Sequence, residues 1–223
     1  MVFPSFYEMS NPLTTVRKQH FWEWFSGDSV NSRWTEGGTS GTVSMKDEVD
    51  GGLSIATGSG GYAHKRIDFG NAGNTGSPTY QTSHGLFSYT AHEWIAVFKW
   101  VSGSTSKTTI GLTGGDGAYG NYQSGFSAIL MDKNANLIYQ RRNTSATSTT
   151  AQAVDGNWHS VKNTLASGTL TTSIDGVLSG TGFTSESSGM PTVKSAPIFE
   201  VYNSNSSGGV AESQLRYYEA YNT

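Results

Sequence analysis

Two carboxylates, Glu48 and Asp50, are spaced as a pair of catalytic acids on a strand would be, because side chains two residues apart in an extended chain share one face. Glycosidases that retain the configuration of the sugar place two such groups about 5 Å apart, one as nucleophile and one as general acid and base. Here the run ends at Gly51-Gly52, which predicts a turn in place of a continued strand. The acid pair is incomplete, and we predict that the protein is not an enzyme.

A second candidate for chemistry is a calcium site in the Gly-rich stretch that holds Asp116 and Asn121. Calcium takes several oxygen ligands from carboxylates, amides and backbone carbonyls, and this loop offers one carboxylate. The run 132–136 starts like a calcium-binding loop but lacks the Gly at the sixth position and the closing Glu. Turn formation by Asp and Asn explains both segments. We expect no cofactor, with calcium at Asp116 and Asn121 as the alternative.

A third candidate is a sugar-binding platform built from aromatic side chains in or near loops. Such rings can stack on pyranose faces while Asn, Asp and Gln bind hydroxyl groups. The residues that could form it are Trp34, Tyr62, Tyr80, Tyr119 and Tyr122. Aromatic residues are also the usual core and interface anchors of a sandwich. The sequence leaves both interpretations open.

Composition narrows the class of protein. The chain has 223 residues with 28 Gly, no Cys, 14% charged residues and a net charge of −3, against about 25% charged residues in an average globular protein. Disulfides and thiolate chemistry are excluded, and the charge argues against a nucleic-acid partner. No apolar run is long enough for a membrane span, and the N-terminus lacks the basic and apolar regions of a signal peptide.

The elements that must position any site are short extended runs separated by Gly, Ser, Asn and Asp. The run 93–100 has Trp94, Ala96, Phe98 and Trp100 on one face, as expected of a central strand. The runs 126–131 and 137–140 predict a hairpin. About a dozen such runs without a helical period predict an all-β fold, a two-sheet antiparallel sandwich of the jelly-roll type.

The most informative stretch is 157–177. His159, Val161 and Leu165 share one face of an extended segment, and Leu170 and Ile174 share a face of the next. Ser167-Gly168 separates the two segments and Asp175-Gly176 ends the second, and such pairs supply the positive φ that tight turns need. The stretch predicts a β-hairpin.

A Trp-His-x-Val strand, a turn and a strand that ends in Ile-Asp-Gly resemble the concanavalin A-like superfamily in its laminin-G-like branch. The aromatic run 20–25 followed by Arg33-Trp34 is similar to the opening of laminin-G-like domains in viral and bacteriophage structural proteins. The resemblance covers about residues 20–223 and implies a fold without an activity. The glucanase motif Glu-x-Asp-x-x-Glu of this superfamily lacks its second Glu here. His92, His159 and Tyr139 could sit together as a lyase site would need, although a lone strand His is usually structural.

The N-terminal segment 1–20 differs from the rest of the chain, so we divide the sequence into an arm, 1–20, and a single sandwich domain, 21–223. The arm is apolar yet has no strand or helix period, and it contains Phe3, Phe6, Tyr7 and Leu13. Docking onto another surface is the simplest way to bury these side chains.

From these features we predict a non-enzymatic structural or surface protein of a larger assembly: a virion component such as a capsid decoration, fibre or tail-associated protein. The expected partners are other protein subunits, including further copies of this chain, and cell-surface glycans. The expected location is the virion or an extracellular surface. A carbohydrate-binding module is the alternative function, and a degenerate glycan-active enzyme is the third.

Overall fold

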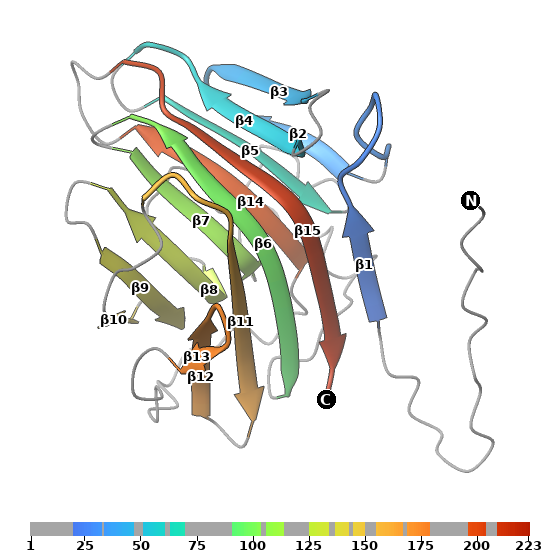
Figure 1. Ribbon diagram of the computed structural model, residues 1–223, viewed down its shortest axis with the longest axis vertical. Coiled ribbons are helices and arrows are strands. Elements are labelled where there is room, and N and C mark those ends of the chain that lie inside the picture. The colour runs from blue at the N-terminus through green and yellow to red at the C-terminus, as the bar shows by residue number, and fades with distance from the viewer. Residues whose placement is uncertain are drawn as a thin grey trace.

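The fold is an antiparallel β-sandwich of two sheets, as predicted (Figure 1). The computed structural model describes residues 20–32, 34–46, 51–60, 63–69, 91–103, 106–113, 125–133, 137–142, 145–149, 155–166, 169–178, 196–203 and 209–223. These segments contain strands and turns and no helix, so none of them holds a helix able to cross a membrane.

Sheet A has eight strands in the order β13-β12-β11-β6-β15-β4-β3, with β1 paired to β15 beside this path. The strands are β1 (His20–Trp24), β3 (Gly41–Met45), β4 (Leu53–Thr57), β6 (His92–Ser102), β11 (His159–Ala166), β12 (Thr169–Ile174), β13 (Val177–Leu178) and β15 (Glu212–Asn222). The longest strands, β6 and β15, pair with each other along the middle of the sheet.

Sheet B has seven strands in the order β10-β9-β8-β7-β14-β5-β2. They are β2 (Trp34–Gly38), β5 (His64–Phe69), β7 (Ser106–Thr113), β8 (Gly125–Asp132), β9 (Leu137–Arg142), β10 (Ser145–Thr149) and β14 (Ala196–Asn203). β8 and β9 form the hairpin predicted for this part of the chain.

The hairpin predicted over 157–177 is confirmed. β11 pairs with β12 so that Val161 lies opposite Ile174 and Leu165 opposite Leu170, with all four side chains buried. Asp175 has a φ of 50° and Gly176 a φ of 78°, as a tight turn requires. This turn leads into β13, so the second arm continues into a short third strand.

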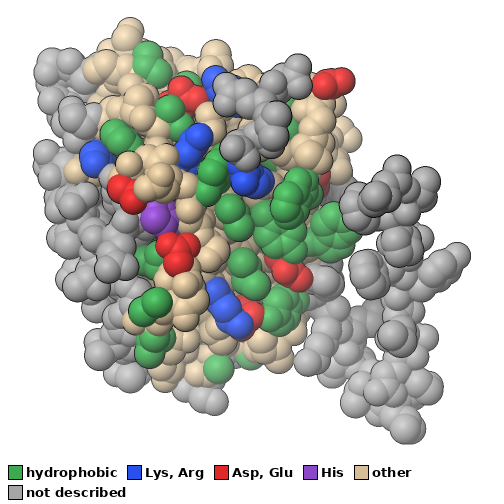
Figure 2. Space-filling view, in the orientation of Figure 1, with side chains coloured by type: hydrophobic (Ala, Val, Ile, Leu, Met, Phe, Trp, Pro, Cys, Tyr) green, Lys and Arg blue, Asp and Glu red, His purple; other side chains and the backbone are tan. Residues whose placement is uncertain are grey.

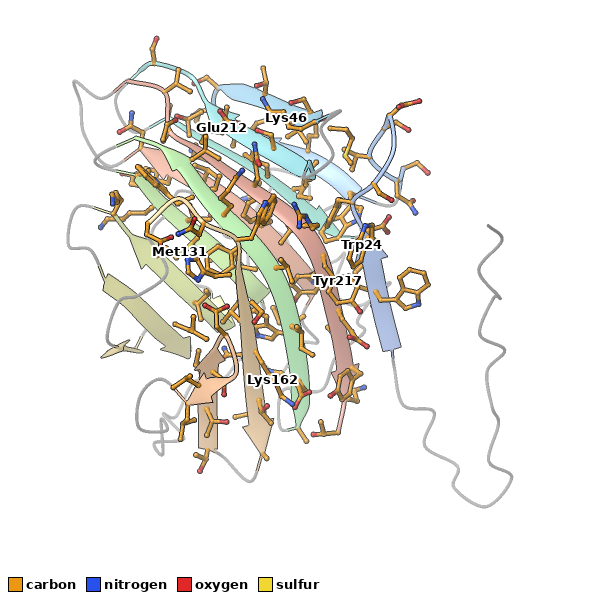
Figure 3. The ribbon with its side chains drawn as sticks, in the orientation of Figure 1. Trp24, Lys46, Met131, Lys162, Glu212 and Tyr217 are labelled. Atoms are coloured by element: carbon orange, nitrogen blue, oxygen red, sulfur yellow. The ribbon has the colours of Figure 1, made fainter. Side chains whose placement is uncertain are left out.

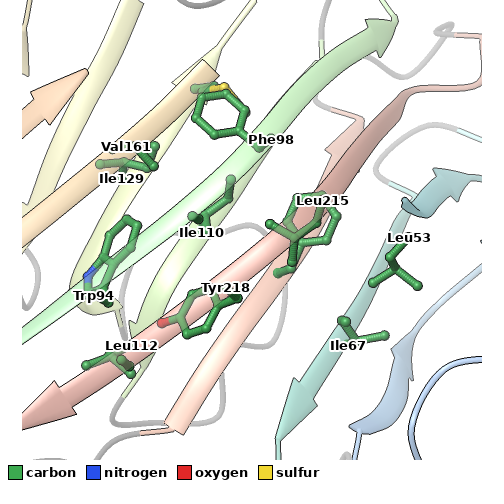
Figure 4. Close-up of a cluster of buried hydrophobic side chains, with 14 of the residues drawn as sticks. Leu53, Ile67, Trp94, Phe98, Ile110, Leu112, Ile129, Val161, Leu215 and Tyr218 are labelled. Carbon is green, nitrogen blue, oxygen red and sulfur yellow. The ribbon is translucent and has the colours of Figure 1, made fainter. Parts of the chain in front are cut away.

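The core lies between the sheets and is built by alternate residues of each strand (Figure 4). On β6, Trp94, Ala96 and Phe98 are fully buried, as their shared face predicts. Tyr218 of β15 stacks on Trp94, with ring centroids 6.1 Å apart and planes 11° apart. Its buried hydroxyl donates a hydrogen bond of 2.9 Å to the carbonyl oxygen of Gly111 on β7. This bond ties sheet A to sheet B through the core.

The predicted N-terminal arm meets the sandwich at β1. The strand begins at His20, one residue inside the segment assigned to the arm, because His20 already pairs with Tyr221 of β15. Phe3, Phe6, Tyr7 and Leu13 lie outside the described residues, so their docking role stays a prediction.

Candidate functional site

The outer face of sheet A carries an unusual group of exposed aromatic side chains. Along β1, Phe21 points into the core and is 7% exposed, whereas Trp22 and Trp24 point outward and are 58% and 53% exposed. Strand pairing places Trp24 opposite Tyr217 of β15, and their ring centroids are 5.4 Å apart. We call Trp22, Trp24 and Tyr217 the aromatic shelf. Figure 2 shows hydrophobic side chains gathered over β1 and β15 on this face, and Figure 3 shows Trp24 beside Tyr217.

Hydrogen-bonding groups border the aromatic shelf. The Tyr217 hydroxyl donates to a carboxylate oxygen of Glu219 at 2.8 Å, and Glu219 lies opposite Trp22 in the strand register. Burial raises the pKa of Tyr217 well above its usual range, and the neighbouring Glu219 carboxylate adds to the rise. The phenol therefore stays protonated at any ordinary pH and keeps its donor role. Flat apolar rings beside fixed hydrogen-bonding groups match the two kinds of contact that a sugar ring offers.

Glu93 of β6 is the most enclosed carboxylate of this face and is 6% exposed. It accepts hydrogen bonds from Thr164 at 2.8 Å and from the Tyr221 hydroxyl, and it pairs with the Lys162 ammonium at 2.7 Å. Burial alone would raise the pKa of Glu93, but the hydrogen bonds from Lys162, Tyr221 and Thr164 outweigh it and hold the pKa below its usual range. Burial and the Glu93 carboxylate raise the pKa of Tyr221 to about 12.

The lowered pKa of Glu93 limits the chemistry that this carboxyl group can perform. A general acid near neutral pH needs a raised pKa, and Glu93 has a lowered one. Three donors of the protein itself also bind its two oxygens. Glu93 therefore orders the side chains around it and keeps Lys162 in place, which suits a preformed binding surface better than proton transfer.

A second aromatic group lies where the chain enters β11. The Trp158 ring has the Lys99 ammonium 4.9 Å and the Arg216 guanidinium carbon 4.0 Å from its centroid. Lys99 comes from β6 and Arg216 from β15, so three distant parts of the sequence meet at this point. Trp158 is half-buried.

His159 holds the turn that precedes β11. One ring nitrogen lies 2.7 Å from an Asp175 oxygen and the other 2.8 Å from an Asp155 oxygen. Burial lowers the pKa of His159, but the hydrogen bonds and charges of both carboxylates outweigh it and raise the pKa above its usual value. Bonds from His159 and Asn157 hold the pKa of Asp155 well below its usual range. We call His159, Asp155 and Asp175 the histidine clamp, because it joins the 155–158 turn to the turn after β12.

The structure corrects one predicted site residue and leaves the others as predictions. Trp34 is 6% exposed in β2 and packs against Phe21, Phe25 and Tyr218, so it is a core residue and cannot stack on a ligand. The remaining predicted residues lie outside the described part of the chain: Tyr62, Tyr80, Tyr119 and Tyr122 for sugar, Asp116 and Asn121 for calcium, and the acid pair Glu48 and Asp50. Among the residues that the structure does describe, no group of three or more His, Cys, Asp or Glu is placed to hold a metal ion.

The proposed grouping of His92 with His159 is also wrong. In the pairing of β11 with β6, His159 lies opposite Phe98 and Leu165 lies opposite His92. The two histidines are therefore separated by six residues along the strand, or about 20 Å at 3.4 Å per residue. His92 and His159 therefore lie at opposite ends of the paired strands β6 and β11.

The predicted site residues do not include the aromatic shelf, although the sequence holds a signal for it. The first strand alternates large aromatics on both of its faces, with Phe21 and Phe25 on one and Trp22 and Trp24 on the other. Only one face of a strand at the surface of a sandwich can enter the core. A doubly aromatic strand therefore indicates either a strand covered on both sides or an exposed aromatic surface, and the structure shows the second.

Comparison with solved structures finds a similar fold in a carbohydrate recognition domain and in glycan-active enzymes. No family model and no curated protein matches the sequence. Among solved structures, the carbohydrate recognition domain of Emp47p aligns with a TM-score of 0.61 at 10% identity, covering 92% of this chain and 95% of that one.

Two glycan-active proteins align equally well. The Crh5 transglycosylase has a TM-score of 0.64 at 13% identity and covers 92% of this chain and 85% of its own. The other is a GH16 protein of the mixed-linkage glucan locus of Bacteroides ovatus, solved with an oligosaccharide product. It aligns with a TM-score of 0.60 at 13% identity, and the alignment covers 89% of this chain and 98% of that one. At these identities the matches show the fold alone, and the laminin-G-like assignment stays a prediction.

Proposed function

We propose that this protein is a non-enzymatic, lectin-like domain that binds glycans on the outer face of sheet A. The observation that carries the proposal is the pair Trp22 and Trp24, each more than half exposed beside Tyr217 and Glu219. The two exposed indoles, of which Trp24 contacts the Tyr217 ring, offer flat surfaces for stacking, and the Glu219 carboxylate and the Tyr217 hydroxyl offer partners for sugar hydroxyls. The likeness to a carbohydrate recognition domain supports the same function.

The absence of catalysis is part of the proposal and is supported by Glu93. This carboxylate is the most enclosed acid of the face, and three donors of the chain hold it ionised. An acid that must protonate a leaving group would need the opposite environment. We therefore expect no hydrolysis or transfer when the protein is incubated with β-glucans, alginate or chitin oligomers. Product formation that Glu93→Gln abolishes would contradict this part.

The direct test is a glycan array followed by calorimetry with the best ligand. Trp24→Ala should weaken binding by about 1 to 3 kcal/mol, or roughly 5- to 150-fold, the scale of one lost aromatic contact. Val210→Ala is the matched control, because Val210 is an exposed apolar residue, 47% exposed, away from β1. Unchanged affinity in Trp22→Ala and Trp24→Ala would show that the aromatic shelf is not the binding site.

A second candidate function is a structural role in a larger assembly, such as a virion, or on another extracellular surface. It is favoured by the position of Trp22 and Trp24 on β1, whose only partner among the described strands is β15. Such an edge with exposed indoles suits contact with another subunit. Deleting residues 2–18 should then leave the sandwich folded and reduce oligomers in light scattering. An unchanged oligomeric state, or unfolding of the domain, would contradict the docking role of the arm.

A further inference from the structure

We infer that the aromatic shelf binds a linear β-1,4-linked glycan with equatorial linkages and contacts two consecutive sugar units of it. This inference rests on the proposed glycan-binding function and names the class of glycan. It starts from Trp22 and Trp24, which share the outward face of β1 and are 58% and 53% exposed.

The spacing of the two indoles fits one sugar unit on each. Side chains two residues apart in a strand point to the same face, and two residues of extended chain span about 7 Å. Trp22 and Trp24 lie opposite Glu219 and Tyr217 in a register without a shift, so the strand stays regular between them. One pyranose ring is too narrow to cover both indoles, whereas two linked units can cover them.

The tilt between Trp24 and Tyr217 sets the direction of the bound chain. Their ring planes make an angle of 54° at a centroid distance of 5.4 Å. A sugar that lies flat on Trp24 therefore cannot lie flat on Tyr217 as well, and the Tyr217 ring forms a side wall. The chain is directed along β1 toward Trp22 instead of across the sheet onto β15.

Polar atoms follow the same direction along β15. The Tyr217 hydroxyl donates to a Glu219 carboxylate oxygen at 2.8 Å, and Glu219 lies opposite Trp22. The hydroxyl and carboxylate oxygens of these two side chains are hydrogen-bond acceptors, and a sugar hydroxyl can donate to either. A chain along β1 therefore has apolar rings beneath it and acceptors beside it.

A chain with equatorial linkages matches this surface. Its sugar rings lie nearly in line, each ring presents C–H groups on both faces, and the hydroxyls lie around the rim. The faces can stack on Trp22 and Trp24 while the rim meets Tyr217 and Glu219. An α-1,4-linked chain curves, so its consecutive rings turn away from a straight strand and only one of them can stack.

The test measures affinity against chain length on the full-length protein. The probes are β-1,4-linked oligomers of glucose, xylose, mannose and N-acetylglucosamine with one to six units, titrated by calorimetry, and the monosaccharides are measured by competition with the hexamer. One aromatic contact corresponds to about two- to tenfold in Kd, and the first bound unit raises the effective concentration of the second. We expect at least one series in which Kd falls by about tenfold or more from one unit to three and changes little beyond. Malto-oligosaccharides, which are α-1,4-linked, are the matched controls and should show no such gain.

Variants assign the gain to the second indole. Trp22→Ala should reduce the gain with length to about twofold or less and leave the affinity for the monosaccharide within about twofold, because Trp24 still holds one unit. Trp22→Phe should retain part of the gain, since it keeps a ring. Val177→Ala is the control, because Val177 is 66% exposed and lies in β13 at the far end of sheet A. Thermal unfolding of each variant verifies that it folds.

The outcomes separate the two proposals. Affinity that does not depend on length, or a gain that persists in Trp22→Ala, overturns the two-unit contact and leaves the proposed function standing. An equal gain for malto-oligosaccharides, or binding at Trp24 of other glycans alone, overturns the linkage class and also leaves the proposed function standing. If no glycan binds and Trp22→Ala instead dissociates an oligomer in light scattering, the shelf contacts a second copy of the chain and both proposals are overturned.

Discussion

Replacing His159 by Gln should make the protein less stable in a way that depends on pH. Both ring nitrogens of His159 face carboxylate oxygens, at 2.7 Å for Asp175 and 2.8 Å for Asp155. A carboxylate can only accept, so both nitrogens must carry a proton and the ring must be the imidazolium for the two bonds to form together. Glutamine cannot carry that charge and cannot donate in two opposite directions.

The size of the effect follows from the exposure of the partners. A hydrogen bond to a charged group contributes about 1.5 to 3 kcal/mol when well shielded, but the side chains of Asp155 and Asp175 are 46% and 49% exposed. Solvent screening brings each pair toward the range of about 0 to 1 kcal/mol found for surface ion pairs. We therefore expect the two bonds together to contribute about 1 to 2 kcal/mol near pH 5, where the imidazole is protonated and the carboxylates are ionised, or roughly 2 to 8 °C in Tm for a chain of this size.

The direction with pH follows from the pKa of His159, which is raised in the folded state. The imidazolium contribution is complete below the unfolded pKa of about 6.5 and is lost as the pH rises through the higher folded pKa. The carboxylates work the other way: the pKa values of Asp155 and Asp175 are lowered, so their contribution is lost in acid, as the pH falls through those lowered values. The clamp should be strongest between these two limits.

The assay is denaturant unfolding of the wild-type protein and His159→Gln between pH 5 and pH 9, with the difference in unfolding free energy plotted against pH. The lost packing of the ring against Phe98, at a centroid distance of 6.3 Å, adds a constant part that does not vary with pH. The difference should shrink as the pH rises through the folded pKa of His159. A difference that is constant across the range, or an NMR titration of His159 with a pKa below its ordinary value, would refute this reasoning.

Four substitutions test the fold. Trp34→Ala should cost about 3 to 5 kcal/mol of unfolding free energy because it opens a cavity in the core, whereas Trp22→Ala should stay within about 0.5 kcal/mol; comparable losses would mean that the assigned faces of β1 and β2 are wrong. Tyr218→Phe should cost about 1 kcal/mol, measured in urea, because it leaves a buried carbonyl oxygen of β7 without its donor. Gly38→Ala should lose more than about 1 kcal/mol, since φ is 117° and a Cβ would lie 2.4 Å from the carbonyl oxygen of His64; a more stable variant would contradict that geometry.

Local sequence patterns were enough to predict the fold class and the 159–174 hairpin. Alternation places Val161, Leu165 and Leu170 on buried faces, and all three are fully buried in the structure. The turn after β12 could also be predicted, because Asp175-Gly176 is a pair that accepts positive φ and both residues have it. These features depend on neighbours within a few residues, which is the range over which periodicity and turn chemistry act.

The candidate site could not be predicted in the same way. Trp34 and Trp24 look alike in the sequence, as aromatic residues near short polar turns, yet one is 6% and the other 53% exposed. What decides between them is the element that covers each face: the Trp34 ring packs against Phe21 and Tyr218 inside the sandwich, while the described residues leave Trp24 covered mainly by its neighbour Tyr217. Alternation determines that two faces differ, and it does not determine which one meets the core.

The charged parts of the site depend on the tertiary structure even more strongly. Lys99 and Arg216 approach one indole because β6 pairs with β15 and a bulge turns Arg216 toward Trp158. His159 and Asp175 meet because β11 pairs with β12. The sequence alone determined an all-β chain with few charges, no cysteine and a hairpin at 159–174. Only the tertiary structure decided which aromatics face the solvent and which charges stand side by side, because strand pairing joins residues far apart in the chain and sheet packing selects the face that is buried.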